Sequence, residues 1–298
     1  MIRKIHQVWV QGQDHFAKTH PEMASWSAKW RDLYPDFEHR LWSEEEYLPL
    51  VKSYSIALAH AYDRAPCFAA KSDIARVVIL LHHGGIYADT DYEPLRRCDW
   101  LIDAHVQLGL VTMALPSAKV LLANFHPDFP CNNAWIYARD HSQYLTSVLD
   151  RIASLPYESG SKEHYTWNVT GPRGWAEVMV SVNVWNQKDV RILPSTMMEI
   201  ADFAHLEPTF MPLTALNKSY PYAVGIHRCN GSWQELGNGA VQSSFGRFYA
   251  AINEWEDFVL IICFASLIAA FIVACVYVVK YNRLRRHVNQ RLTRTISG

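Results

Sequence analysis

Apolar and polar positions along the first hundred residues follow patterns that predict short strands separated by helices. Residues 5–10 are apolar enough for a buried strand, and residues 37–42 are expected to form a second strand. Between them, Trp26 and Trp30 recur at helical spacing, and Pro35 is expected to end that helix. The chain is therefore expected to begin with a strand, a helix and another strand.

A stronger helical pattern follows. We expect Ser72 to cap this helix, because the apolar residues between 74 and 81 recur at i, i+3, i+4 and i+7. Gly84-Gly85 is expected to end it, before a strand at residues 86–88. Strands that alternate with helices predict an α/β fold with a mostly parallel sheet and flanking helices. Ligands in such folds bind beyond the carboxyl ends of the strands.

Two carboxylates, Asp89 and Asp91, come directly after the strand predicted at 86–88. In an extended segment residues i and i+2 point to the same face, so both side chains are expected to reach one ion. Hard oxygen ligands of this kind suit Mg²⁺ or Mn²⁺, which takes its remaining ligands from phosphate and water. An Asp-x-Asp pair also occurs by chance at turns, so the pair alone leaves a structural role open.

The helix before this strand carries a second pair of charged residues. Asp73 and Arg76 are three residues apart and are therefore neighbours on one helix face, while the apolar residues occupy another face. One interpretation is a surface ion pair. The other places both side chains beside the metal, because Gly84-Gly85 leads the chain directly from this helix to Asp89 and Asp91.

The length and net charge of the chain indicate how many domains it can form and which kinds of partner it can bind. The chain has 298 residues, half of them apolar and 19% charged, which is enough for one large α/β domain or two small ones. A net charge of -1 and the absence of a long basic run before residue 250 argue against a nucleic-acid partner. The eleven tryptophans fit a carbohydrate-handling or membrane-associated protein, or simply a tryptophan-rich core.

The C-terminal region predicts a membrane anchor. Residues 258–279 are 22 positions without a charge, Pro, Gly or Asn, long enough for a transmembrane helix. Acidic residues precede this segment and the tail at 280–298 is basic, so the tail is expected in the cytosol and the domain at 1–250 in the lumen of a Golgi or ER membrane. Residues 1–6 contain no apolar signal segment, which instead favours insertion after translation and a cytosolic domain. A single-pass protein is expected, with both orientations open.

Several motifs, in this order, resemble the DXD-motif sugar transferases of glycosyltransferase family 32. That family includes fungal mannosyltransferases acting on inositol phosphorylceramide, an initiating mannosyltransferase of N-glycan outer chains, and capsular-polysaccharide enzymes. The resemblance covers roughly residues 2–235. Its motifs are Ile5-His6-Gln7-Val8-Trp9, Leu41-Trp42, Ser72-Asp73-Ile74-Ala75-Arg76 and His83-Gly84-Gly85-Ile86-Tyr87-Ala88-Asp89-Thr90-Asp91, with a looser match at 132–133, 170–172, 227 and 231–233.

The resemblance implies a GT-A fold, which is a Rossmann-like sheet with flanking helices, together with a nucleotide-sugar donor, Mn²⁺ or Mg²⁺, and retention of the anomeric configuration. The implied reaction is hexosyl transfer, with mannose from GDP-mannose as first choice. The implied acceptor is membrane-associated, such as an inositol phosphorylceramide or another glycolipid. A UDP-sugar-dependent transferase acting on a glycan or polysaccharide stays open.

The resemblance also implies roles for individual residues. Asp91 is expected to ligate the metal, Asp89 to contact the donor and a metal-bound water, and His227 to supply a further metal ligand. Arg76 and the indole of Trp233 are expected to stabilise the leaving diphosphate. The remaining expected donor contacts are Trp9 stacking on the base, Asp73 on sugar hydroxyls, Tyr87 in the nucleoside pocket, Asn132 or Asn133 near the sugar, and Ser232 in a closing loop with Trp233.

Two other classes compete with a transferase. A haloacid-dehalogenase-like phosphatase also places an Asp-x-Asp after a strand, but Tyr92-Glu93 follows here in place of the x-Thr or x-Val of those enzymes. A non-catalytic, membrane-anchored sugar or nucleotide binder is the second alternative. Two departures from the family weaken the choice of substrate: Gln234 stands where a His often follows the Ser-Trp pair, and the N-terminal membrane segment of the fungal ceramide-mannosylating members is not found.

Overall fold

The computed structural model describes residues 2–102, 105–112, 130–198 and 218–228, which all lie in one compact unit, Met1–Glu235. Among these residues no helix is both long and apolar enough to cross a bilayer. The transmembrane helix predicted at 258–279 and the tail at 280–298 lie outside the described residues and stay predictions.

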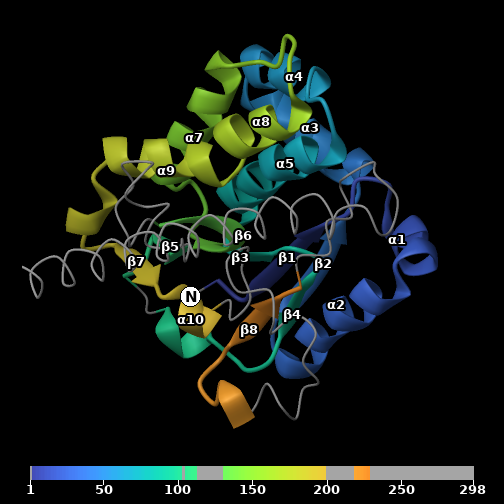
Figure 1. Ribbon diagram of the computed structural model, residues 1–298, viewed down its shortest axis with the longest axis vertical. Coiled ribbons are helices and arrows are strands. Elements are labelled where there is room, and N and C mark those ends of the chain that lie inside the picture. The colour runs from blue at the N-terminus through green and yellow to red at the C-terminus, as the bar shows by residue number, and fades with distance from the viewer. Residues whose placement is uncertain (1, 103–104, 113–129, 199–217, 229–298) are drawn as a thin grey trace, which may run out of the picture. The chain divides into compact units, whose positions relative to one another are not determined.

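Strands and helices alternate in the described part of the chain, as the hydrophobic pattern predicts (Figure 1). The order is β1 Lys4–Val8, α1 Gln13–Thr19, α2 Pro21–Leu33, β2 Glu38–Trp42, α3 Glu44–Tyr54, α4 Ile56–Asp63, α5 Phe68–His83, β3 Gly85–Ala88, β4 Tyr92–Pro94, a 3₁₀ turn Asp99–Leu101, β5 Leu108–Thr112, β6 Pro130–Ala138, α7 Gln143–Ser154, α8 Lys162–Tyr165, a π-helical turn Thr166–Thr170, α9 Pro172–Ser181, a 3₁₀ turn Val184–Asn186, β7 Val190–Leu193, α10 Ser195–Met198 and β8 Gly225–His227.

The main sheet of the described residues has six strands in the order β2-β1-β3-β6-β5-β7. β1 is parallel to both β2 and β3, which confirms the parallel arrangement predicted for the N-terminal strands. β6 is antiparallel to its two neighbours, β3 and β5, whereas β5 and β7 are parallel. The sheet is therefore mixed, and β6 brings residues 130–138 against the strand that leads to Asp89.

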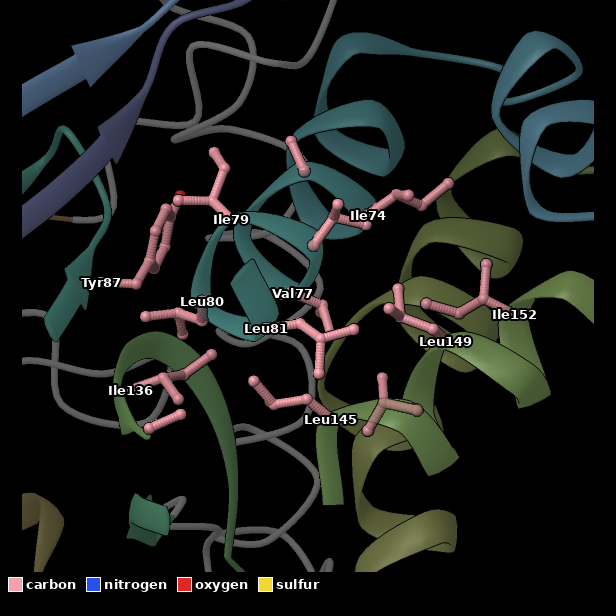
Figure 2. Close-up of a cluster of buried hydrophobic side chains, with 14 of the residues drawn as sticks. Ile74, Val77, Ile79, Leu80, Leu81, Tyr87, Ile136, Leu145, Leu149 and Ile152 are labelled. Carbon is pink, nitrogen blue, oxygen red and sulfur yellow. The ribbon is translucent and has the colours of Figure 1, made fainter. Parts of the chain in front are cut away.

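Helices cover both faces of this sheet. On one face α5 packs against α3 and α7, while α4 and α9 pack against α7. The apolar residues of α5 meet Tyr87 of β3 and Ile136 of β6 (Figure 2). On the other face Trp30 of α2 packs with Ile86 of β3 and Trp135 of β6. Because alternate residues of β3 and β6 face opposite layers, both strands are buried, and they hold the carboxyl end of β3 and the neighbouring first half of β6 in fixed positions.

Helix α5 is longer than its apolar repeat predicts. It begins at Phe68 after Cys67, so the prediction that Ser72 caps this helix is wrong and Ser72 lies within it. Asp73 and Arg76 are buried with 4% and 5% exposure, which rules out the interpretation as a surface ion pair. The helix is covered on both the apolar and the charged face, and periodicity alone could not distinguish these faces from solvent.

The turn from α5 into β3 depends on glycine. Gly84 and Gly85 have φ angles of 58° and 106°, which glycine adopts without strain. A Cβ on Gly85 would lie 2.6 Å from the carbonyl oxygen of Lys4 in β1, so the close pairing of β1 with β3 also requires glycine there. These two residues bring the end of α5 and the start of β3 next to each other.

Candidate active site

The two carboxylates lie on a tight turn. β3 ends at Ala88, and the carbonyl of Asp89 accepts a hydrogen bond from the N–H of Tyr92 at 3.0 Å, which closes a four-residue turn. The N–H of Asp89 donates to the carbonyl of Ala134 in β6 at 2.8 Å. The extended geometry predicted for Asp89 and Asp91 is therefore wrong, because the backbone reverses directly after β3.

The turn nevertheless brings both carboxylates to one point, together with an imidazole. One ligand atom from each of Asp89, Asp91 and His227 lies within 4.8 Å of the other two. The His227 Nε2 atom is 3.1 Å from Asp91 Oδ1, and β8 places His227 opposite Tyr92 of β4. Two carboxylates and an imidazole are ligands that a divalent ion such as Mn²⁺ accepts, so this group, the metal trio, fits such an ion.

A buried arginine joins the metal trio to α5. The Nη2 atom of Arg76 is 3.0 Å from Asp89 Oδ1 and 3.1 Å from Asp73 Oδ1, and Nη1 donates to the carbonyl of Asn133 at 2.6 Å. The guanidinium also lies over the ring of Tyr87, 4.7 Å from its centroid. Arg76 therefore supplies the positive charge that lets two carboxylates stand close together in a buried place.

Asp73 is held by side chains from three separate segments. Its Oδ1 accepts a hydrogen bond from Asn133 Nδ2 at 2.9 Å, and its Oδ2 accepts one from Thr170 Oγ1 at 2.8 Å. Thr170 is fully buried at the end of the π-helical turn. We call Asp73, Arg76, Asn133 and Thr170 the donor-side network, and its polar atoms are well supplied with partners.

Burial changes the acidity of this group. It raises the pKa of Asp73 to about 6, against the opposing effect of Arg76, and it also raises the pKa of Asp89. Burial by itself lowers the pKa of Arg76, but the nearby carboxylates, Asp89 foremost, raise it above its ordinary value. The pKa of Tyr87 lies well above its usual value, mainly because of burial, so at neutral pH its O–H donates to Asp89 Oδ1 at 2.7 Å.

Some predicted donor contacts lie elsewhere or outside the described residues. Trp9 is buried in an aromatic cluster with Phe16, and its indole N–H donates to His15 Nδ1 at 3.1 Å, so stacking on a nucleotide base stays a prediction. Asn132 accepts a hydrogen bond from the N–H of Ala134 within its own strand, whereas Asn133 joins the donor-side network. Ser232 and Trp233 lie outside the described residues.

Sequence reasoning missed one residue that holds the turn. Gln7 is fully buried in β1, and its Nε2 donates to the carbonyl of Asp89 at 3.1 Å. Its Oε1 accepts from Ser27 Oγ of α2 at 2.5 Å and lies 2.9 Å from His39 Nε2 of β2. Gln7 and its neighbour His6 are polar residues in a strand expected to be buried, and this was the available signal, because such groups need buried partners.

Comparisons with known proteins relate part of this chain to glycosyltransferases. Residues 21–107 match the family model described as "Glycosyltransferase sugar-binding region containing DXD motif". Inositol phosphoceramide mannosyltransferase 3 of Schizosaccharomyces pombe is 31% identical over 101 residues, 33% of this chain and 26% of that protein. An uncharacterized glycosyltransferase of Acanthamoeba polyphaga mimivirus is 30% identical over 29% of this chain and 34% of its own length.

A longer match is weaker. Inositol phosphoceramide mannosyltransferase 1 of Schizosaccharomyces pombe is 24% identical over 202 residues, 65% of this chain and 56% of that protein. The chain thus spans between about a quarter and a little over half of the length of these curated relatives. A solved glycosyltransferase involved in glycosylation of the major capsid of PBCV-1 covers 77% of this chain and 94% of its own, at 9% identity and a TM-score of 0.39, too low to support an inference.

The matched region contains Asp73, Arg76, Asp89 and Asp91, whereas Asn133, Thr170 and His227 lie beyond it. The relatives of about 30% identity are named either glycosyltransferase or mannosyltransferase. Residues 21–107 are therefore a glycosyltransferase sugar-binding region with a DXD motif, and through this region the chain is related to the fungal mannosyltransferases.

Proposed function

We propose that the chain is a metal-dependent, retaining glycosyltransferase with a GT-A fold. It would move a sugar from a nucleotide-sugar donor to an acceptor hydroxyl, with mannose from GDP-mannose as first choice. The observation that carries this proposal is the convergence of Asp89, Asp91 and His227 within 4.8 Å, directly beside the buried Arg76. The sugar-binding family match and the names of the fungal relatives support it.

The residues fit the charge changes of such a transfer. The bond between the anomeric carbon and the diphosphate oxygen breaks, a bond from that carbon to the acceptor oxygen forms on the same face, and the acceptor proton leaves with the diphosphate. Asp91, Asp89 and His227 would hold Mn²⁺ or Mg²⁺, which when bound stabilises negative charge on the diphosphate. Arg76 would add a fixed positive charge beside it.

The donor-side network fits the other end of the donor. Asp73 and Asn133 are oriented by Arg76 and Thr170, so their polar atoms are fixed before a sugar binds. Preorganised groups of this kind lower the barrier because little rearrangement is needed during the reaction. We therefore assign sugar hydroxyls to the Asp73 and Asn133 side of the site and the diphosphate to the metal trio.

A membrane-associated acceptor is the second element of the proposal. Three relatives carry the name inositol phosphoceramide mannosyltransferase, and residues 258–279 are predicted from sequence to be a transmembrane helix. An inositol phosphorylceramide or another glycolipid fits both observations. We propose a single-pass protein of a Golgi or ER-type membrane with a lumenal domain, and treat a cytosolic domain as the alternative orientation.

A donor screen tests the proposal. The purified chain is incubated with GDP-mannose and with UDP-linked hexoses, and released GDP or UDP is measured with Mn²⁺ and with a chelator. We expect metal-dependent release from GDP-mannose that the Asp91→Asn variant loses. Release from a UDP-sugar alone would replace the donor with that sugar, while no release from any donor by the folded chain, with or without a glycolipid acceptor, would contradict the transferase assignment.

A further inference from the structure

One buried ion cluster lies outside the roles assigned so far. Glu93 of β4 is 1% exposed, and its carboxylate is bound by two cations from distant segments. Lys29 of α2 reaches Oε1, while the Nε atom of Arg228 donates to Oε2 at 2.8 Å. The guanidinium of Arg228 also lies 5.6 Å from the ring centroid of Trp26. We call Lys29, Glu93 and Arg228 the Glu93 latch.

The latch is attached directly to the metal trio. Arg228 follows His227, and its peptide N–H donates to the carbonyl of Asp91 at 2.9 Å. His227 itself belongs to β8, which pairs only with β4 among the described residues, over three residues in each strand. A two-stranded pairing of this length is only marginally stable by itself. Other contacts must therefore hold β8 in place.

We propose that the Glu93 latch positions His227 against Asp91 and thereby sets the affinity of the metal trio for a divalent cation. This inference rests on the proposed metal-dependent function. The three latch residues act as positioning residues, because they hold β4, β8 and α2 together without belonging to the trio. Ligand distances in a metal site tolerate shifts of only about 0.2 Å, so a small movement of β8 is enough to weaken binding.

The burial of Glu93 strengthens this argument. A carboxylate that is 1% exposed is expensive to desolvate, and it is tolerated only when cations are held close to it. Arg228 therefore cannot leave without exposing or displacing Glu93. Arg228, which directly follows His227, is thus tied to β4 through Glu93.

The decisive experiment measures Mn²⁺ binding by the full chain, using the electron paramagnetic resonance signal of free Mn²⁺. Arg228→Lys keeps the charge and the backbone N–H but loses the guanidinium contacts to Glu93. We expect Mn²⁺ to bind about 10- to 100-fold more weakly to this variant, the usual effect of removing a group that orients a metal ligand. Unchanged affinity in the folded Arg228→Lys variant would overturn the latch.

Lys29→Gln separates positioning from simple electrostatics, because it removes a positive charge near the trio. A long-range charge effect alone would tighten Mn²⁺ binding, whereas loss of the latch weakens it. Weaker binding is the expected result, and tighter binding would overturn the inference. This variant also decides the matter if Arg228→Lys does not fold, since the Lys29 side chain is 35% exposed and its loss disturbs the core less.

Glu177→Gln is the matched control. Glu177 likewise bridges two cations, Arg151 and Arg173, but it lies on α9 and is 50% exposed. We expect wild-type Mn²⁺ affinity in this variant. A wild-type chain without Asp91-dependent Mn²⁺ binding would overturn the metal trio and the latch together, whereas Asp91-dependent binding that Arg228→Lys leaves unchanged would overturn the latch alone.

Discussion

The donor-side network and the metal trio, the two halves of the candidate site, are held in place by different parts of the fold. The donor-side network is fixed by α5 and by β6 of the six-stranded sheet, and its members bind one another inside the protein. The metal trio takes two members from one turn and the third from a three-residue strand that arrives about 136 positions later in the chain. The donor-side network is thus part of the buried core, and we call it the core half. The metal trio lies at the edge of the core, and we call it the edge half.

The difference teaches how charge is compensated in each half. In the donor-side network Arg76 balances the carboxylate of Asp73 and also reaches Asp89 of the metal trio, so the protein supplies its own cation there. The metal trio instead gathers two carboxylates around one imidazole, and we propose that a divalent ion completes it. Changes in the first half should therefore act on folding as well as on donor binding, and changes in the second mainly on metal binding and transfer.

The largest expected effect comes from Asp91→Asn. If the ion contributes about 4 kcal/mol to stabilising the transition state, kcat/KM for transfer falls about a thousandfold. The melting temperature should stay within a few degrees of wild type, because Asp91 belongs to the edge half of the site. Activity assays with Mn²⁺ and calorimetry on the same preparation measure both quantities. Metal-dependent transfer at the wild-type rate would contradict the assignment.

Arg76→Met should, unlike Asp91→Asn, lower the stability of the fold as well as the rate of transfer. It leaves Asp73 and Asp89 without their buried cation, so the free energy of unfolding should fall by about 3 kcal/mol, measured by urea denaturation. Arg40→Met is the control, since Arg40 pairs with Glu46 at the surface and its loss should matter little. If both variants were equally stable, Arg76 would not be the centre of the core half.

The sequence predicts the core half better than the edge half. The spacing of Asp73 and Arg76 on one helix, followed by Gly84-Gly85, allowed either a surface ion pair or a place beside Asp89, and the structure favours the second. These relations are local: helical spacing puts Asp73 and Arg76 on one face, and the glycine pair returns the chain to Asp89, although periodicity alone did not show that this face is buried.

The remaining relations are not local. Asn133 reaches Asp73 only because β6 pairs antiparallel with β3, and periodicity contains no information on strand order. The turn at Asp89 also escaped prediction, because an Asp-x-Asp pair is compatible with a strand end as well as a turn. His227 was expected near the carboxylates from a family resemblance and not from the hydrophobic pattern, and the structure brings it there.

A pH experiment tests how firmly His6 is held in the six-stranded sheet that supports the donor-side network. Burial lowers the pKa of His6 in β1 to about 3, and its two ring nitrogens face the Gly84 carbonyl at 2.9 Å and the indole N–H of Trp42 at 3.1 Å. In the unfolded chain the imidazole takes up a proton below about pH 6.5, whereas the folded chain resists it. Stability contributed by neutral His6 is therefore lost as the pH falls from about 6.5 towards 3.

Between pH 7 and pH 5 this loss should amount to about 2 kcal/mol in the free energy of unfolding. Urea denaturation of wild type and His6→Gln at both values measures it, and the variant should lose about 2 kcal/mol less than wild type over this interval. His60→Gln is the control, because His60 is exposed on α4. Equal pH dependence in wild type and His6→Gln would show that His6 is not held neutral by its partners.

The smallest expected effect concerns Thr170, whose hydroxyl donates to Asp73 Oδ2 at 2.8 Å. Thr170→Ala should lower the free energy of unfolding by about 1.5 kcal/mol, because a buried carboxylate loses a hydrogen bond. Thr166→Ala is the matched control, since that hydroxyl donates to the carbonyl of Lys162 four residues earlier. If Thr170 orients Asp73 for the donor, Thr170→Ala raises KM for the nucleotide sugar while Thr166→Ala does not, and Thr170→Ser restores it. An equal change in both alanine variants would make Thr170 part of the fold and not of the site.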